Sequence, residues 1–420
     1  MRRKVLAVLS VVLLCTTLTA GETIRVVGVN HPWTDAMKTV VDDFEKETGI
    51  TVKLDVYGED QLLQKLMVEF LAGNSDVDVF ATRPLMEGRV MHKNGWYANM
   101  EPYYRDDKDY DFEDFTPGAV GCTQIDGVQI AIPLQTEVEV LYYRKDLLDA
   151  KGIAPPKTLE EMREAAAKLH NPKEEIYGFV ARGQRSALIS QFSSYLYNHG
   201  TDFYDKKTRK SLVNTPEFIA AAKFYGGMLR DYGPEGAQNL GWPQALAIFA
   251  QGKAALFTEA TAHYPTLLNP EKSVVADKTD CIMLPAGPVG YKTYDITAFG
   301  LSIYSKSKNK DAAWKFIRYM TDKDRTLIFQ GDFANQCARK SIYTIPEGIR
   351  KFPPSLVKAI FDSAPYGVGN TLPDVVAVGE ARDIIGNVVV TAIAGGDVEA
   401  AAKAADKSFQ GLLDREGKEE

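Results

Sequence analysis

Residues 132–169 read IPLQTEVEVLYYRKDLLDAKGIAPPKTLEEMREAAAKL, and this stretch decides the fold. Its β-branched, aliphatic and aromatic residues predict a strand that ends before Pro133 and another strand over Val138–Tyr143. After a proline-rich loop, Thr158 and Glu161 form a capping box, and apolar residues at helical spacing predict a helix. Strands followed by an amphipathic helix are typical of an α/β unit.

The sequence before this stretch predicts alternating strands and helices. A β-branched run over Thr23–Val29 is followed by a helical pattern that ends at Gly49, and a second strand follows over Ile50–Val56. Another helical pattern over residues 62–71 leads to a short buried strand at Val77–Ala81. Because strands and helices alternate, we expect a parallel sheet with crossover helices, which makes the fold α/β.

The sequence after this stretch is mostly helical until the chain returns to strand. Residues 182–270 carry helical patterns around a short strand at Ala254–Phe257, and a longer strand is predicted at Thr297–Tyr304. Two long helical patterns close the chain, over residues 374–394 and 397–413. A chain of 420 residues without a long linker exceeds one ordinary core, so we expect two domains between which the chain crosses more than once.

The first twenty residues have the composition of a secretory signal peptide. Basic residues at positions 2–4 precede an apolar run over residues 5–14, and small residues follow. The run is shorter than the roughly 20 apolar residues that span a bilayer. We therefore predict export to the periplasm, with cleavage of residues 1–20 near Ala20. An uncleaved anchor and a lipid anchor on Cys15 are the alternatives.

Charge and cysteine content exclude other classes of protein. The net charge is −7, and loss of the three basic leader residues lowers it to −10. Nucleic-acid binding needs a basic surface, so we expect no nucleic-acid partner.

Cys122, Cys281 and Cys337 show no C-x-x-C or Cys/His metal spacing, so no metal site is expected. Buried free thiols are the expected state, and one disulfide is the alternative.

Four blocks of sequence together resemble the family 1 extracellular solute-binding proteins, the maltose-binding-protein-like carbohydrate carriers of ABC importers. Residues 132–169 contain a proline-ended strand, an aromatic strand, a Lys-Asp-Leu turn and a Pro-Pro-Lys-Thr helix entry, as that family does. GKAALF at 252–257 resembles the family's Gly-Lys-x-Ala strand, and SKSKNKDAAWKFIRYMTD at 305–322 resembles its Ser-Lys-Asn-Lys helix entry. The two closing helices complete the order of the blocks.

This resemblance implies a two-lobed periplasmic binding protein type II fold with crossing hinge strands. A ligand in the cleft would favour closure of the lobes, because it contacts the closed state better. We expect a monomer without a cofactor that delivers its ligand to the permease subunits of an ABC transporter. The implied boundaries are 21–135 and 286–318 for lobe one, 140–280 and 325–420 for lobe two, and hinges near 136–139, 281–285 and 319–324.

Candidate ligand-binding residues follow from the rule that ligands of open α/β sheets bind outside the carboxyl ends of the strands. The resemblance to maltose-binding protein supports the acidic pair at 59–60, the Thr-Arg pair at 82–83 and Glu137, and it adds Arg382 in the long C-terminal helix. The predicted set is Trp33, Glu59, Asp60, Thr82, Arg83, Gln135, Glu137, Trp242, Glu259, Thr261, Asp295 and Arg382.

The chemistry of this set suits a polyhydroxylated ligand. Charged side chains form strong hydrogen bonds with hydroxyls, and an aromatic face such as that of Trp33 or Trp242 covers the C–H patch of a sugar. Aromatic platforms are fewer than in maltose-binding protein, so a monosaccharide, polyol or sugar acid is expected. Arg83 and Arg382 would hold the carboxylate of a sugar acid, unless they form salt bridges with neighbouring acids.

Two other functions are compatible with parts of the sequence. Catalysis lacks support, because the five histidines show no H-x-x-x-H or H-E-x-x-H spacing and neither a G-x-S-x-G motif nor a P-loop occurs. Glu137 and Glu139 on one face of a strand could still mimic a glycosidase pair. Another kind of carrier is the second alternative. An iron carrier would use tyrosines such as Tyr103-Tyr104 or Tyr142-Tyr143, for which packing is the favoured interpretation. A polyamine carrier would need a cleft dominated by carboxylates, which Arg83 and Arg382 argue against.

Overall fold

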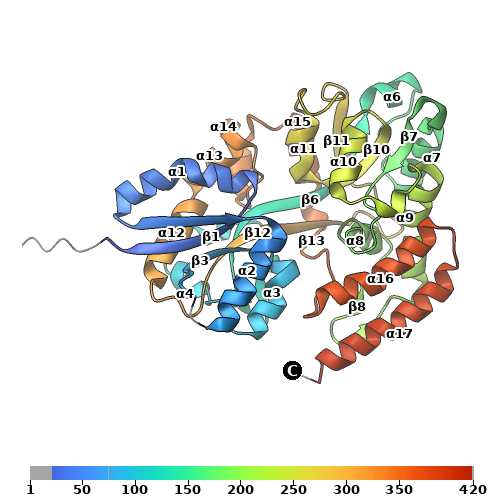
Figure 1. The fold of residues 1–420 in the computed structure, drawn as a ribbon. Coiled ribbons are helices and arrows are strands. Elements are labelled where there is room, and N and C mark those ends of the chain that lie inside the picture. Colours follow the sequence, from blue (N-terminus) through green and yellow to red (C-terminus); the bar gives the residue numbers. More distant parts are fainter. Residues whose placement is uncertain (1–20, 74, 419–420) are drawn as a thin grey trace, which may run out of the picture.

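The computed structural model describes residues 21–73 and 75–418, apart from the side chains of Glu59 and Asp60. The predicted signal peptide lies outside the described residues. Figure 1 shows two bodies joined by strands that run from one to the other. Among the described residues, no helix combines the length and the apolar composition needed to cross a membrane.

The strands are β1 (Thr23–Val29), β2 (Thr51–Tyr57), β3 (Val79–Thr82), β4 (Gln124–Ile125), β5 (Val128–Gln129), β6 (Ile132–Arg144), β7 (Tyr177–Val180), β8 (Tyr204–Asp205), β9 (Lys210–Ser211), β10 (Ala254–Ala260), β11 (Thr279–Met283), β12 (Thr293–Ile303) and β13 (Gly367–Val368).

The helices are α1 (Pro32–Thr48), α2 (Glu59–Ala72), α3 (Pro84–Lys93), α4 (Glu101–Tyr104), α5 (Pro117–Cys122), α6 (Lys145–Ala150), α7 (Leu159–Leu169), α8 (Ile189–Asn198), α9 (Pro216–Tyr232), α10 (Trp242–Ala250), α11 (Tyr264–Leu267), α12 (Lys310–Thr321), α13 (Lys323–Phe333), α14 (Pro346–Ile349), α15 (Pro354–Ser363), α16 (Val378–Ile393) and α17 (Val398–Glu416).

One mixed sheet runs through both bodies in the order β2-β1-β3-β12-β6-β10-β7. β1 pairs in parallel with β2 and β3, as the alternation of strands and helices predicts. The first half of β6 pairs with β12, and its second half pairs with β10 and β11. β6 therefore belongs to the sheet of each body, which confirms the expected α/β class.

The break predicted at Pro133 is wrong, because β6 is continuous from Ile132 to Arg144. Pro133 is the second residue of the strand and lies opposite Gly300 of β12. On the side away from β12, no strand pairs with β6 at Pro133, so a residue without an N–H group is tolerated there. The strand forms because nearly every residue is buried among aliphatic and aromatic neighbours.

The hydrophobic core divides into parts that match the two bodies. Residues of β1–β3, α1, α2 and α12 form one core, and we name the body around it lobe one. Residues of α7–α9, α16 and α17 form the main core of the other body, lobe two. A smaller core of lobe two lies on the opposite face of its strands, where helices α10, α11 and α15 cover them.

We propose that the chain passes between the lobes along β6, along β12 and near residues 334–338. The passage expected at 281–285 overlaps β11, which pairs with the lobe-two half of β6. The passage expected at 319–324 precedes Phe329, which packs in the core of lobe one. Cys337 contributes to a lobe-two core and Ala338 to the lobe-one core, so the chain lies between the lobes there.

The cysteines are in the state expected from the sequence. Cys122, Cys281 and Cys337 are all free and buried. Burial raises the pKa of the Cys122 and Cys337 thiols to about 12, so their thiolates are scarce at neutral pH.

The contact between α9 and α16 requires a glycine at position 226. A Cβ atom on Gly226 would lie 2.4 Å from the Cβ of Ala392. We expect Gly226→Ala to lower the free energy of unfolding by about 1–3 kcal/mol, because the helices must separate. Gly411→Ala in α17 is the control, since its Cβ meets nothing within 4 Å and should stabilise by about 0.5–1 kcal/mol. Urea unfolding measures both, and equal shifts would contradict a close-packed contact.

Candidate functional site

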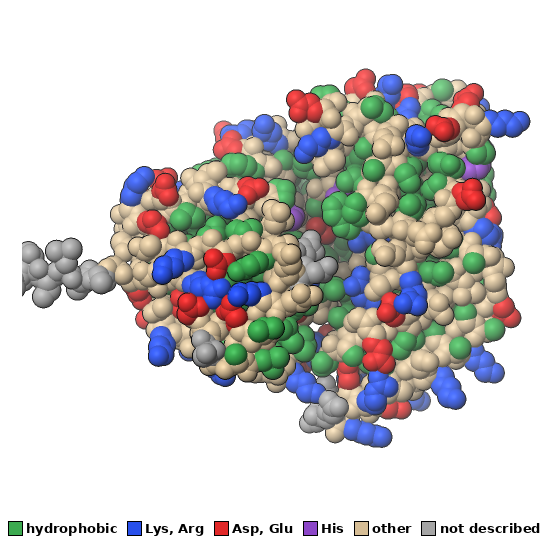
Figure 2. Space-filling model, in the orientation of Figure 1, with side chains coloured by type: hydrophobic (Ala, Val, Ile, Leu, Met, Phe, Trp, Pro, Cys, Tyr) green, Lys and Arg blue, Asp and Glu red, His purple; other side chains and the backbone are tan. Residues whose placement is uncertain are grey.

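Loops that follow strands of both lobes meet at the boundary between the lobes. His31 follows β1 in lobe one, and His263 follows β10 in lobe two. Burial, together with the nearby His263, lowers the pKa of His31 to about 4. The two imidazoles are therefore neighbours across the boundary. Figure 2 shows that the molecular surface is hollowed along this boundary.

The crossing strands present one polar face to this boundary. Gln135, Glu137 and Glu139 alternate along β6 and therefore share a face. In β12, Tyr294 lies on the same face as Glu139, because the neighbouring register pairs Ile296 with Glu137. The Gln135 side-chain oxygen is buried and has no hydrogen-bond partner in the described part of the chain. This face thus offers polar groups at the point where the lobes join.

An ion pair at the ends of β7 and β10 is the centre of the polar network. Arg182 donates from Nε to Glu259 Oε2 at 2.8 Å and from Nη2 to Oε1 at 2.7 Å. Gln191 of α8 donates from Nε2 to Glu259 Oε1 at 2.6 Å and to the Tyr294 hydroxyl at 3.0 Å. Burial opposes ionisation of Glu259, but Arg182 outweighs it, so the pKa of this carboxyl lies below its usual value.

Glu139 is buried beside this ion pair and differs from Glu259 in its charge state. Both of its oxygens are inaccessible and without a hydrogen-bond partner among the described residues. Burial raises the pKa of Glu139 well above its usual value, and the charge of Glu259 adds to this effect. Because Glu139 cannot reach a substrate, it does not form a glycosidase-like pair with Glu137.

Arg382 brings a further cation to the same boundary. Its Nε donates to the Ser186 carbonyl at 2.9 Å, and its Nη1 lies 3.4 Å from the sulfur of Met86 in lobe one. Burial lowers the pKa of Arg382 to about 10, and the charges of Arg182 and Arg83 act in the same direction. Three guanidinium groups from α3, the β7 loop and α16 therefore gather around one space.

The alternative in which Arg382 forms a salt bridge with Asp383 is wrong, and the one in which Arg83 pairs with Glu59 involves a side chain outside the described part of the chain. Arg83 pairs with Glu87 at 3.2 Å, one turn along α3. Asp383 pairs with Arg185 instead of Arg382. Glu59 and Asp60 open α2 at this boundary, and their side chains lie outside the described part of the structure.

Aromatic side chains flank the polar groups on both lobes. Trp242 opens α10 and stacks on His263 with ring centroids 4.9 Å apart and planes 19° apart, while 42% of its surface stays exposed. On lobe one, Trp33 is buried against Phe299, and its indole nitrogen has no partner among the described residues. Trp242 is thus available to a ligand, whereas Trp33 is mainly packed.

Three predicted ligand residues have structural contacts instead. The Thr82 hydroxyl bonds with the Tyr97 hydroxyl at 2.6 Å, and Thr261 accepts from the Val138 amide at 3.1 Å. Asp295 lies next to Tyr294 in β12, so it points to the opposite face of the strand, where Gly118 and Gly367 approach it. Burial raises the pKa of Asp295 to about 6.

The sequence reasoning missed Arg182, Gln191 and His263. Arg182 follows the strand Tyr177–Val180, and the rule about strand ends would have selected it. The region around it carries a helical pattern, so the short strand was not predicted. His263 lies within a turn two residues after the predicted Thr261, and Gln191 lies inside α8, where no local signal marks it.

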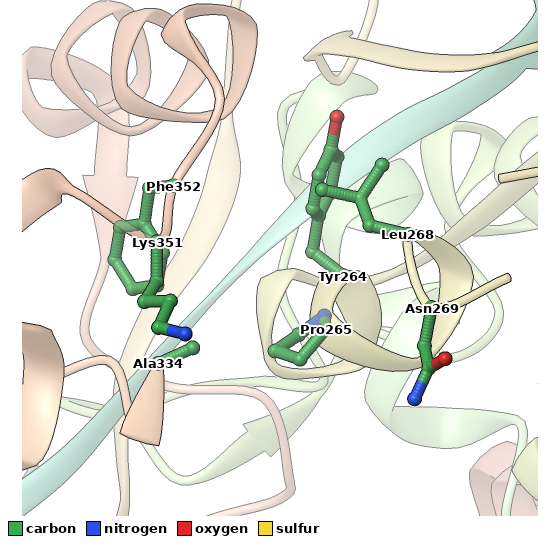
Figure 3. A pocket seen from close by; sticks show the side chains of 7 residues that line it. All are labelled: Tyr264, Pro265, Leu268, Asn269, Ala334, Lys351 and Phe352. Carbon is green, nitrogen blue, oxygen red and sulfur yellow. The ribbon is translucent and has the colours of Figure 1, made fainter. Parts of the chain in front are cut away.

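A separate pocket opens between α11 and the segment after α13. Tyr264, Pro265, Leu268 and Asn269 lie on one side, and Ala334, Lys351 and Phe352 lie on the other (Figure 3). Its walls are mainly apolar, and it contains none of the predicted ligand residues. The polar boundary described above therefore fits a hydroxyl-rich ligand better than this pocket does.

The tyrosine pairs are packed, as expected. The Tyr142 hydroxyl donates to the Ala260 carbonyl at 2.8 Å, and Tyr103 stacks on Trp314. Among residues 21–73 and 75–418, no group of three or more His, Cys, Asp or Glu side chains is arranged to hold a metal ion. An iron site built from these tyrosines is therefore not supported by their contacts.

Comparison with known families agrees with this geometry. Residues 30–325 match the sequence profile of the bacterial extracellular solute-binding proteins. The chain belongs to this family. As a member of a binding family it is not an enzyme, and its fold is the type II periplasmic binding fold.

Relatives of this solute-binding protein include carriers of small polyols. A putative binding protein of Brucella abortus is 31% identical, with 76% of each chain covered. The mannitol-binding protein of Pseudomonas aeruginosa is 27% identical over 72% of this chain and 70% of its own. A solute-binding protein of Agrobacterium radiobacter K84, solved with ribitol, has a TM-score of 0.81 and 27% identity, covering 93% of this chain and 99% of its own.

The Arg182–Glu259 pair should be important for stability. Replacement of Arg182 by Met leaves a buried carboxylate without its cation, so we expect the free energy of unfolding to fall by about 3–5 kcal/mol. Arg163→Met is the control, because its pair with Glu160 is exposed and should contribute less than about 1 kcal/mol. Urea unfolding at neutral pH measures both losses, and comparable losses would show that the buried pair has no special role.

Asp295 should make stability depend on pH in a defined direction. Its pKa is raised in the folded state, so the folded protein binds more protons than the unfolded chain between about pH 4 and pH 6. Stability due to this group falls as the pH rises through that window. We expect Asp295→Asn to match the wild type near pH 4 and to be more stable by up to about 3 kcal/mol at pH 7–8. Stability curves that stay parallel from pH 4 to pH 8 would refute this expectation.

Proposed function

We propose that this protein captures a small polyol, sugar or sugar acid between its lobes and delivers it to the permease of an ABC importer. The observation that carries this proposal is the convergence of a pre-organised ion pair, further cations and an exposed indole from both lobes at one boundary. Family membership and the polyols bound by the mannitol and ribitol carriers support the same class of ligand.

The Arg182–Glu259 pair is suited to hold hydroxyls without rearrangement. Arg182 uses Nε and Nη2 on Glu259, which leaves its Nη1 as the donor for a ligand oxygen. Gln191 holds the carboxylate from the other side and also donates to the Tyr294 hydroxyl. Since each partner is already held in place, a ligand does not have to order them, and less of the binding free energy is lost.

Glu137 and Trp242 complete the proposed site. Glu137 lies half-buried on the cleft face of β6, between Gln135 and Glu139. A carboxylate there accepts hydrogen bonds from ligand hydroxyls, and such charge-assisted bonds are roughly twice as strong as neutral ones. Trp242 presents an exposed face that covers the C–H groups of a polyol or sugar ring.

Arg382 extends the range of ligands to sugar acids. In the described part of the chain it forms no ion pair with a carboxylate, and its partners are a carbonyl and a thioether. A partly buried cation of this kind is stabilised by an oxygen-rich ligand, and most strongly by a carboxylate. Sugar acids therefore belong in the ligand screen beside neutral polyols.

We also propose export and a periplasmic location. This proposal is supported by the family, which consists of extracellular solute-binding proteins, and by the signal-peptide composition of residues 1–20. Acidic and basic side chains are interspersed on the face shown in Figure 2, which suits a carrier that binds neither nucleic acid nor a charged surface. The outer surfaces of the lobes remain for the permease.

Calorimetry with D-mannitol, ribitol, D-glucose and D-gluconate tests the proposed function. We expect at least one ligand to bind with a Kd near the micromolar range, about −8 kcal/mol. Glu137→Gln should weaken that binding about ten-fold or more, because a charge-assisted bond contributes about 1.5–3 kcal/mol. Glu160→Gln on the exposed surface of α7 is the matched control and should bind as the wild type does.

Absence of binding to all four compounds would reject the proposed ligand class. Equal affinities of the Glu137→Gln and Glu160→Gln variants would remove Glu137 from the site. A preference for D-gluconate that disappears in Arg382→Met would identify Arg382 as the group that recognises the carboxylate.

A further inference from the structure

A salt bridge joins the two lobes through residues that are not among the proposed ligand contacts. Arg89 lies in α3 of lobe one, and Asp374 lies before α16 of lobe two, 285 positions further along the chain. The contact is bidentate: Arg89 Nε donates to Asp374 Oδ1, and Nη2 donates to Oδ2 at 3.0 Å. Two parallel bonds of this kind fix both distance and orientation.

Each end of the bridge is fixed to its own lobe. Asp374 lies between Leu372 and Val375, which are buried in the main core of lobe two, and its carbonyl accepts a bond from the Tyr204 hydroxyl at 2.9 Å. Arg89 lies between Gly88 and Met91, which are buried in lobe one. The bridge therefore connects two rigid bodies instead of two mobile loops.

The surroundings of the bridge favour its ionised form. The two side chains are 24% and 29% exposed, so solvent screens them less than a surface pair. Lys206 lies 3.7 Å from Asp374, and Asp126 lies 3.5 Å from Arg89. Burial opposes the charge of Asp374, but Arg89 and Lys206 outweigh it and hold the pKa of this carboxyl below its usual value.

Apolar contacts beside the bridge also cross the boundary. Leu85 and Met86 of α3 pack against the main core of lobe two. The Met86 sulfur lies 3.4 Å from Arg382 Nη1. One side of α3 is thus covered by lobe two in this arrangement, and a rotation about β6 and β12 that opens the cleft would separate all these contacts.

We propose that the Arg89–Asp374 bridge stabilises the closed arrangement of the lobes and so sets ligand affinity without touching the ligand. The effect on affinity rests on the proposed function, in which the ligand binds between the lobes. A ligand that binds only the closed state has an apparent Kd that rises as the closed fraction falls. Loss of the bridge should therefore weaken ligand binding because it lowers the closed fraction, although neither residue contacts the ligand.

The variants are Arg89→Met, Asp374→Asn and the double variant. Arg318→Met is the matched control, because Arg318 forms a bidentate bridge with Asp107 entirely within lobe one, at 2.6 and 3.3 Å. The exposed fractions of this second pair, 35% and 25%, are close to those of the Arg89–Asp374 bridge. A general loss of stability affects all variants, whereas a loss of closure affects only the interlobe pair.

Small-angle X-ray scattering of the ligand-free protein measures closure, and calorimetry with D-mannitol and ribitol measures affinity. We expect Arg89→Met and Asp374→Asn to enlarge the radius of gyration and to weaken binding about three- to ten-fold. The double variant should be no weaker than either single one, because the two residues act as one pair. Arg318→Met should match the wild type in both measurements.

An unchanged radius of gyration in Arg89→Met, relative to the wild type and Arg318→Met, would overturn the proposal. So would an Asp374→Asn effect that adds fully to that of Arg89→Met. The radius of gyration could rise in Arg89→Met and Asp374→Asn while neither polyol binds the wild type or any variant. In that case the role of the bridge in closure is confirmed and the polyol assignment fails.

Discussion

The structure depends on one strand that pairs with strands of both lobes. β6 pairs with β12 through its first half and with β10 and β11 through its second half. Because side chains alternate along a strand, a slip of one residue would turn Glu137 and Glu139 to the opposite face. The same slip would move Val140 and Tyr142 out of the lobe-two core in which they are buried. Packing in lobe two therefore fixes the direction of the polar side chains between the lobes.

The boundary between the lobes is polar, and this has an energetic cost. Glu259 is fully buried and remains charged because Arg182 and Gln191 compensate for its lost hydration. Glu139, two residues away from Glu137 on the same face, has no such partner, and its neutral form is favoured. The carboxyls of Glu139 and Glu259 thus differ in charge because their surroundings differ.

Binding and closure use different groups in this arrangement. The proposed ligand contacts come from the ends of β7 and β10, from β6, from α10 and from Arg382 of α16, whereas Arg89 lies on α3 and Asp374 lies before α16. This separation allows affinity to be adjusted at the interlobe bridge without a change in the groups that recognise the ligand. A small hydroxyl-rich ligand has few atoms to contact, so the free energy of the interlobe contacts matters for its affinity.

Much of the fold was predictable because its signals are local. The capping box at Thr158 needs only neighbouring residues, and it is confirmed by the bond from the Glu161 amide to the Thr158 hydroxyl. The alternation of strands and helices is likewise read from short stretches of sequence. The continuity of β6 was not predictable, since Pro133 is tolerated because no second strand pairs with β6 at that residue. Arg182 was hidden for a similar reason, because a four-residue strand inside a helical region has no periodic signal of its own.

The sequence by itself determined the α/β class, the family and the loops in which ligand residues had to be sought. Only the tertiary structure decided which side chains in those loops face the boundary. Asp295 and Tyr294 are adjacent in sequence, yet they point to opposite faces of β12, and Arg89 meets Asp374 across 285 positions. Local patterns specify elements, because propensity and capping act over a few residues. The charge and contacts of a site arise from groups that the folded chain brings together, and no local pattern records them.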